Sequence, residues 1–296
     1  EVTSAVSRGQ RALAALQRPD GSWDRDAATT SLALLALASA ERPPPEQRDT
    51  SPIARGLARL EAVAGGRGSH RGGAFESWVQ SRLAPLYLRP VSPETVRDLH
   101  SVLIRHWSAS DRTDEAAGFA PRPGSAPTLP ATCSALELLT ALEPPPAPPS
   151  EMLPLPNPQQ RPALLAFLSA EAPPDSITDA KTRLERQVLI ALSRVLLRRD
   201  PEESSEQLPP ALAGGLRDSD LDILLPPSGL LPDPLLLWRL ARVLGASRSE
   251  NTHGTRAVEV ANRLLAAQQG NGTWKNRTNG EGTVATVGAL LALQSL

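Results

Sequence analysis

Three aspartates at alternate positions, Asp218, Asp220 and Asp222, are the first candidates for acid chemistry. Carboxylates this close resist ionising together when they are buried, and one of them can then serve as a general acid. The flanking segments are rich in proline and glycine, which favours a solvated loop or the first turn of a short helix, where the helix dipole stabilises acidic residues. The spacing leaves both interpretations open.

The cysteine and the histidines do not support a metal site. Cys133 is the only cysteine, and one thiolate cannot hold zinc. His100 and His106 are six residues apart and fall on different helix faces, while His70 and His253 stand alone in the sequence. We therefore expect no metal and no cofactor, and we expect Cys133 to be a small apolar residue on a buried face.

The composition is that of a soluble globular protein, with 296 residues, 40% of them hydrophobic, and a formal net charge of -1. No run of 18 or more apolar residues occurs, so we expect no transmembrane segment. The near-neutral charge argues against binding to nucleic acid. The sequence opens at Glu1 without methionine, so we expect a trimmed product of something longer. The compartment stays open, and export is one alternative if a signal peptide was removed before Glu1.

Helix-forming residues dominate and strand signals are nearly absent, so we expect an all-α protein. The proline-rich connector at 143–162 is the only candidate for an internal boundary, and we expect one domain over residues 1–296. Twelve candidate helices lie at about 2–17, 26–40, 52–64, 74–88, 93–107, 131–142, 160–170, 179–199, 206–215, 234–246, 254–269 and 282–296.

The helices at the two ends of the chain alternate between two kinds. Residues 2–17 form an amphipathic pattern, whereas residues 29–37 carry no polar face. The same contrast recurs between residues 254–269 and residues 284–296. An amphipathic helix lies at a surface and an all-apolar helix is buried, so we expect pairs of one outer and one inner helix.

A spaced motif occurs at both ends of the chain, between the outer and the inner helix. Its residues are Gln17, Gly21 and Trp23 in the first copy and Gln268, Gly272 and Trp274 in the second. The glycine permits a left-handed turn, the tryptophan can fold back over it, and the glutamine amide can bond backbone groups left free at helix ends. We expect a turn lock in the first and last pairs of a closed ring.

These copies resemble the QW motif of the squalene cyclase and protein prenyltransferase superfamily. A partial third copy supports the likeness, because Gly118-Phe119 followed by Arg122-Pro123 resembles the Gly-Phe-x-x-Arg-Pro loop of that family. The resemblance implies an α/α toroid of six outer and six inner helices. Twelve candidate helices fit one such toroid.

The catalytic residues that the resemblance implies are missing. The prenyltransferases hold zinc with an Asp-x-Cys pair and a later histidine, but Ala131 stands two positions before Cys133 and the last inner helix has no histidine. The cyclases use an Asp-x-Asp-Asp acid motif, and the spacing within 218–222 differs from it. Aromatic faces steady cationic intermediates, and only 3% of the residues are aromatic. We therefore expect a toroid without enzymatic activity.

We expect this toroid to bind an apolar, isoprenoid-like small molecule, or a protein partner at its rim. In the family that the sequence resembles, the active centres lie where the inner helices begin. The corresponding candidate ligand-binding residues are Thr29, Thr30, Thr132, Cys133, Thr283 and Thr286.

Other classes of function stay open. A terpene-cyclase-like enzyme would use Asp218, Asp220 and Asp222 as its acid, and a structural repeat module of a larger secreted protein would need no site. Glycosidases and lyases built on α/α barrels point carboxylates into the cavity. Glu76 and Glu137 could do so, although no motif singles them out, and we expect a helix surface or a salt bridge for Glu137.

Overall fold

The computed structural model describes residues 1–38, 51–65, 75–109, 116–142, 160–171, 179–197, 218–246, 251–275 and 282–296. Within these residues the chain forms twelve helices and two short strands. The helix expected at 206–215 lies outside the described residues, and so does most of the connector at 143–162.

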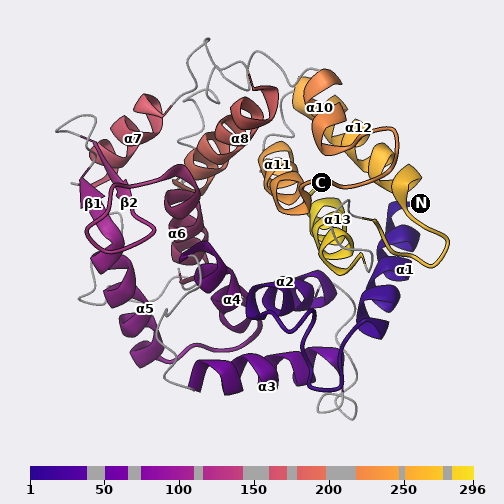
Figure 1. Cartoon of the computed structure of the whole chain (residues 1–296), viewed down its shortest axis with the longest axis horizontal. Helices are drawn as coiled ribbons and strands as arrows, with labels where there is room; N and C mark the ends of the chain where they lie inside the picture. The colour runs from indigo at the N-terminus through magenta and orange to yellow at the C-terminus, as the bar shows by residue number, and fades with distance from the viewer. Residues whose placement is uncertain are drawn as a thin grey trace.

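The helices form two concentric rings (Figure 1). The all-α toroid predicted from the sequence is confirmed, since outer and inner helices alternate around the whole ring. The outer helices are α1 (Val2–Ala15), α3 (Pro52–Gly65), α5 (Pro93–His106), α7 (Gln160–Ala170), α10 (Asp218–Leu224) and α12 (Asn251–Ala267). The inner helices are α2 (Ala27–Ala38), α4 (Phe75–Leu88), α6 (Leu129–Leu142), α8 (Ala180–Leu197), α11 (Pro234–Ala246) and α13 (Thr283–Ser295).

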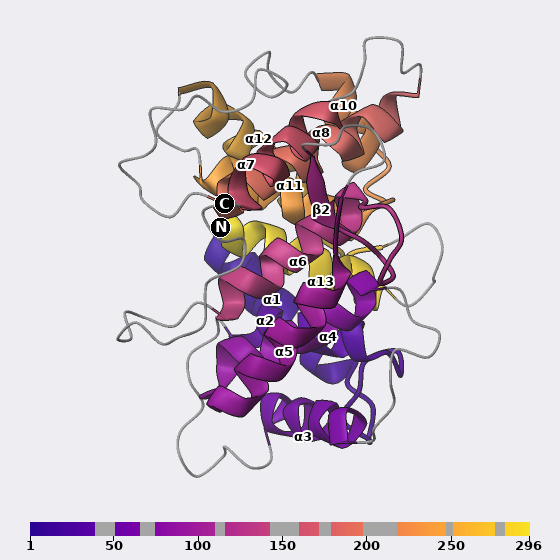
Figure 2. The same ribbon diagram turned by 90° about the vertical axis from the view of Figure 1, so that its left-hand side faces the viewer.

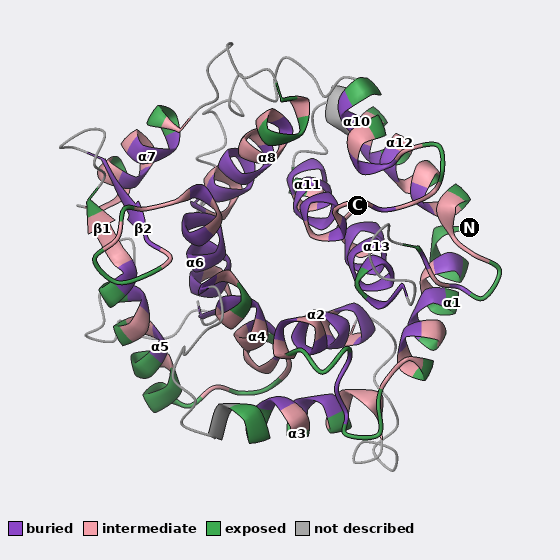
Figure 3. Ribbon diagram, viewed as in Figure 1, coloured by how far each residue is buried: buried purple, intermediate pink, exposed green. Residues whose placement is uncertain are grey.

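Burial separates the two rings as the hydrophobic patterns predict (Figure 3). The inner helices α2, α6 and α13 are buried along most of their length, whereas the outer helix α1 buries one stripe that includes Ala5, Gly9 and Leu13. The hydrophobic core therefore lies within the inner ring and between the two rings. None of the described helices is long and apolar enough to cross a membrane.

The first copy of the motif fastens α1 to α2 and to α3. Trp23 is fully buried, and its indole N–H donates to the carbonyl oxygen of Leu13 at 2.8 Å. The side-chain amide of Gln17 donates to the carbonyl oxygens of Gly21 at 3.0 Å and Pro52 at 2.8 Å. Since Pro52 is the first residue of α3, one glutamine holds the turn and the next outer helix together.

The second copy repeats this geometry between α12, α13 and α1. The indole N–H of the fully buried Trp274 donates to the carbonyl oxygen of Leu264 at 2.8 Å. The side-chain amide of Gln268 donates to the carbonyl oxygens of Gly272 at 3.1 Å and Ala5 at 2.9 Å. Because Ala5 belongs to α1, the second copy joins the last outer helix to the first and closes the ring.

A small β-hairpin interrupts the helices, although no strand was expected from the sequence. Strand β1 (Trp107–Ala109) pairs antiparallel with β2 (Ala117–Phe119), and β2 packs against α7 on the outside of the ring (Figure 2). The hairpin stands at the partial third copy of the motif. His106, buried at the end of α5, fixes it through a 2.7 Å hydrogen bond between its Nδ1 and the carbonyl oxygen of Ala120.

Candidate functional site

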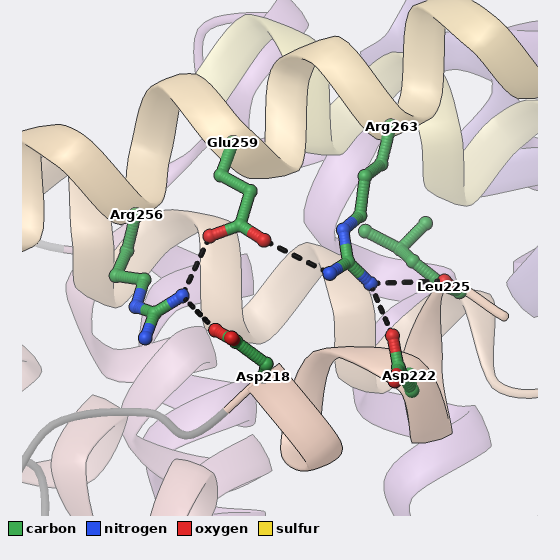
Figure 4. A network of polar contacts seen from close by, with 6 residues as sticks. All are labelled: Asp218, Asp222, Leu225, Arg256, Glu259 and Arg263. Carbon is green, nitrogen blue, oxygen red and sulfur yellow. Dashed lines mark hydrogen bonds and ion pairs between the residues drawn. The ribbon is translucent and has the colours of Figure 1, made fainter. Parts of the chain in front are cut away.

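The three clustered aspartates lie in α10, in the outer layer, and two of them face α12 (Figure 4). Asp218 accepts a 2.6 Å hydrogen bond from Arg256, and Asp222 accepts one of 2.6 Å from Arg263. Glu259 lies between the two arginines and accepts from Arg256 at 2.6 Å and from Arg263 at 2.9 Å. These hydrogen bonds raise the pKa of both guanidinium groups. We call these five residues the α10–α12 clamp.

Asp220 points away from its two neighbours. It is buried and lies 4.0 Å from the guanidinium of Arg183 on the inner helix α8. The aspartates therefore attach α10 to α12 on one face and to α8 on another. Asp218 and Asp222 are paired with arginines of the outer layer, and the acid role that the alternative interpretation gave to the three aspartates stays a prediction.

The threonines expected to bind a ligand sit at the starts of the inner helices. Thr30, Thr132 and Thr286 are buried, and each hydroxyl oxygen accepts the backbone N–H of an aromatic residue that precedes its helix. The aromatic residues are Trp23, Phe119 and Trp274, at distances of 3.0, 3.0 and 3.1 Å respectively.

The remaining residues of that set differ from one another. Thr29 donates its N–H and hydroxyl to Asp26, at 2.7 and 2.8 Å, and so completes the amino-terminal cap of α2. Thr283 is buried in the first turn of α13. Burial raises the pKa of the Cys133 thiol to about 11, which makes it a poor nucleophile. A ligand-binding role for these positions stays a prediction that the contacts do not test.

Glu137 forms a buried salt bridge, one of the two places expected for it. It accepts from Arg239 at 3.1 Å and from Arg242 at 2.7 Å, so it connects α6 to α11. Burial lowers the pKa of Arg239, but the charge of Glu137 and the other nearby groups outweigh that effect and leave the pKa above its usual value.

Glu76 lies half-buried in the first turn of α4. Among the described residues, no group of histidine, cysteine and acidic side chains could hold a metal ion. His70 and the side chain of His253 lie outside them.

A cavity of about 410 Å³ lies where the inner helices α6 and α8 begin. Its walls come from the segment that leads into α6, from the end of α7 and from the first turns of α8. The lining residues are Ala126, Pro127, Thr128, Leu129, Pro130, Phe167, Glu171, Thr182, Glu185, Arg186 and Leu189.

Two carboxylates and one guanidinium supply the charges of this cavity. Arg186 donates its Nη2 to Oε2 of Glu171 at 2.5 Å, and its Nη2 and Nε also donate to the backbone oxygen of the same residue at 3.1 and 3.3 Å. Glu185 is half-buried and has no hydrogen bond or ion pair within the described part of the chain. The cavity therefore presents one paired and one unpaired carboxylate.

The candidate residues predicted from the sequence also lie where inner helices begin, but Glu171 and Glu185 were not among them. Glu171 and Glu185 are fourteen positions apart, and no motif marks them among the many charged residues of this region. The sequence feature that could have pointed to them is their position, since Glu171 lies at the end of an outer helix and Glu185 lies near the start of the next inner helix. Those two locations meet in an α/α toroid.

The fold matches solved structures of carbohydrate-acting enzymes. A GH76A α-1,6-mannanase from Salegentibacter sp. HEL1_6 is similar over 100% of this chain and 98% of the other, with a TM-score of 0.61 at 9% sequence identity. An inactive variant of that enzyme, in complex with α-1,6-mannotriose, matches over 100% and 99% with a TM-score of 0.59 at 10% identity. No protein-family model matches the sequence, and neither does any curated protein.

These matches correct two expectations. The assignment to the squalene cyclase and prenyltransferase superfamily is wrong, because the similar structures are α-1,6-mannanases. The expected role as a non-catalytic domain for an apolar ligand is wrong as well, since the similar proteins are glycoside hydrolases and one was solved with an oligosaccharide. The Gln-x-x-x-Gly-x-Trp spacing therefore marks how a toroid locks its turns, and it does not identify that superfamily.

Proposed function

We propose that this protein is a glycoside hydrolase that cleaves an oligosaccharide in the cavity between α6, α7 and α8. The observation that carries the proposal is the presence of Glu171 and Glu185 in one cavity at the start of the inner helices. Two carboxylates at one site are the usual requirement of glycosidic-bond hydrolysis. The toroid that the chain shares with α-1,6-mannanases supports the same class of reaction.

The environments of the two glutamates suggest different roles. The guanidinium of Arg186 compensates the charge of Glu171, so we assign Glu171 the part of the carboxylate that acts as base or nucleophile. Glu185 has no such partner within the described residues, so we assign it the part of the acid that protonates the leaving oxygen.

The size and lining of the cavity are compatible with a sugar. A volume of about 410 Å³ is within the range of small-ligand sites, which runs from about 300 to 1,000 Å³. Thr128 and Thr182 offer hydroxyl groups, while Pro127, Leu129 and Pro130 provide an apolar wall. Such a mixture of apolar surface and a few polar groups is typical of binding sites for small molecules.

The experiment is a hydrolysis assay on a panel of neutral oligosaccharides that includes α-1,6-mannotriose. The wild-type protein and the variants Glu171→Gln and Glu185→Gln are compared by chromatography of the products. We expect each variant to lose about a hundredfold or more in rate, as is usual when an acid or base group is removed. The matched control is Glu94→Gln, which changes an exposed glutamate in the first turn of α5 and should leave the rate unchanged.

Two results would contradict the proposal. One is equal rates for the wild type and both cavity variants, which would place any activity elsewhere. The other is the absence of both product and binding, measured by calorimetry with Glu185→Gln, across the whole panel.

A further inference from the structure

The pairing of Glu171 with Arg186 bears on which sugars the cavity can accept. Among the described residues that line the cavity, the charged ones are Glu171, Glu185 and Arg186, so two carboxylates face a single guanidinium. We infer that this pair makes the cavity selective for uncharged sugars over anionic ones. The inference rests on the proposed function and adds to it a substrate class and the residues that determine it.

The guanidinium is already engaged. Two of its nitrogens, Nη2 and Nε, donate to the carboxylate and the backbone oxygen of Glu171. A site for an anionic sugar needs an arginine or lysine whose donors can reach a carboxylate or a phosphate. To free Arg186 for such a ligand, its ion pair with Glu171 would have to break.

Replacing Glu171 with a ligand anion as the partner of Arg186 is costly because both side chains are largely buried. The side chains of Arg186 and Glu171 are 25% and 13% exposed, and a charge that loses its partner in such a site is strongly destabilised. Glu185 offers an anionic sugar no compensating positive charge, because a carboxyl group is neutral when it is protonated and negative when it is ionised. A neutral sugar meets neither obstacle, because its hydroxyl groups can donate to the carboxylates as they stand.

The charged residues that lie near the cavity but do not line it leave this preference for neutral sugars unchanged. Asp179 and Lys181, at the start of α8, contribute one charge of each sign. Arg122 lies exposed in the turn before Ala126, where solvent screens it. It is nevertheless the cation that could recruit an anion to the rim, so the experiment tests it separately.

Calorimetry with two matched probes tests the inference. One probe is α-1,6-mannotriose with sulfur in place of each glycosidic oxygen, which a hydrolase does not cleave, and the other is the same thio-linked trisaccharide with its terminal CH₂OH group oxidised to a carboxylate. We expect the wild type to bind the neutral probe at least about tenfold more tightly. Glu171→Gln removes the negative charge that neutralises Arg186 and leaves its hydrogen bonds to the backbone oxygen in place. The affinity ratio should therefore shift toward the acidic probe by roughly ten- to a hundredfold, the effect of a charge-assisted hydrogen bond.

Three control variants separate this mechanism from a general change of charge. Glu185→Gln removes a carboxyl group from the cavity but leaves Arg186 paired, so its shift should be smaller than that of Glu171→Gln. In the Glu171→Gln background, Arg186→Gln should abolish the gained affinity, whereas Arg122→Gln should preserve it.

The outcomes distinguish the inference from the proposed function. If the wild type binds both probes with similar affinity, or if Arg122→Gln abolishes the gain, the selectivity mechanism is wrong and the hydrolase proposal stands. If neither probe nor any other sugar of the hydrolysis panel binds to any variant, both are wrong.

Discussion

The side-chain amide of Gln268 donates a 2.9 Å hydrogen bond to the carbonyl oxygen of Ala5, 263 positions earlier in the chain. Gln17 makes the corresponding bond to Pro52 at 2.8 Å. Each glutamine oxygen in turn accepts from an arginine of the outer helix it reaches, Arg8 for Gln268 and Arg55 for Gln17, at 2.8 and 2.7 Å. The seam between the two ends of the chain is therefore built like a junction between two consecutive outer helices.

This equivalence predicts that Gln268→Ala destabilises the protein about as much as Gln17→Ala. Each change leaves backbone oxygens and an arginine without their partner, so we expect a loss of about 1–3 kcal/mol in the free energy of unfolding. Urea unfolding followed by circular dichroism measures it. Gln269→Ala is the control, because within the described residues the Gln269 side chain bonds only the nearby carbonyl of Ala267. A Gln268→Ala variant as stable as this control would show that the seam does not depend on the lock.

A second prediction concerns the glycines of the locks. Gly21 and Gly272 have φ values of 84° and 88°, and an added Cβ would lie 2.5 Å from the oxygen of Arg55 and 2.7 Å from that of Arg8. Gly21→Ala and Gly272→Ala combine backbone strain with a clash, so we expect each to cost about 2 kcal/mol or more.

Gly270 is a matched control for that prediction. It precedes Gly272 by two residues, lacks a positive φ, and has no atom within 4 Å of an added Cβ. Gly270→Ala should leave the melting temperature unchanged or raise it slightly. A melting temperature lowered equally by Gly270→Ala and Gly272→Ala would contradict the account of the turn.

The fold could be predicted because its signals are local and repeated. The spacing from Gln17 to Trp23 recurs from Gln268 to Trp274, and the inner helices α2 and α13 carry no charged residues. The family could not be deduced from the same residues. The lock satisfies backbone groups at helix ends, which any toroid with such turns must do.

The hairpin and the cavity depend on tertiary contacts that could not be predicted from the spacing of residues in the sequence. Strand β1 has three residues, and its pairing of Trp107 with Phe119 needs a partner twelve positions away. Glu171 and Glu185 line the same cavity, and Arg186 ties the end of α7 to α8 beside them. In the sequence, those charges are indistinguishable from the charged surface of any outer helix.

The thiol of Cys133 predicts a loss of stability at alkaline pH. Burial raises its pKa from 9.0 to about 11, so the folded state keeps the proton after the unfolded state has lost it. The contribution is fully present below about pH 9 and is lost as the pH rises through about 11, by roughly 2–3 kcal/mol in all. Denaturant unfolding across this window should show a steeper decline for the wild type than for Cys133→Ala. Equal slopes would show that the thiol is not protected from ionisation.

The α10–α12 clamp predicts a small stabilisation that depends on salt. The side chains of Asp218 and Asp222 are 76% and 52% exposed, so each aspartate pair should contribute no more than about 1 kcal/mol. Glu259 contacts both arginines and is 29% exposed, so Glu259→Gln should cost more than Asp222→Asn. Urea unfolding at about 0.05 and 1 M NaCl should show both effects shrinking at high salt. Asp98→Asn, an exposed change on α5, is the control. A Glu259→Gln variant indistinguishable from it at low salt would mean that the charge of Glu259 adds nothing to the stability of the clamp.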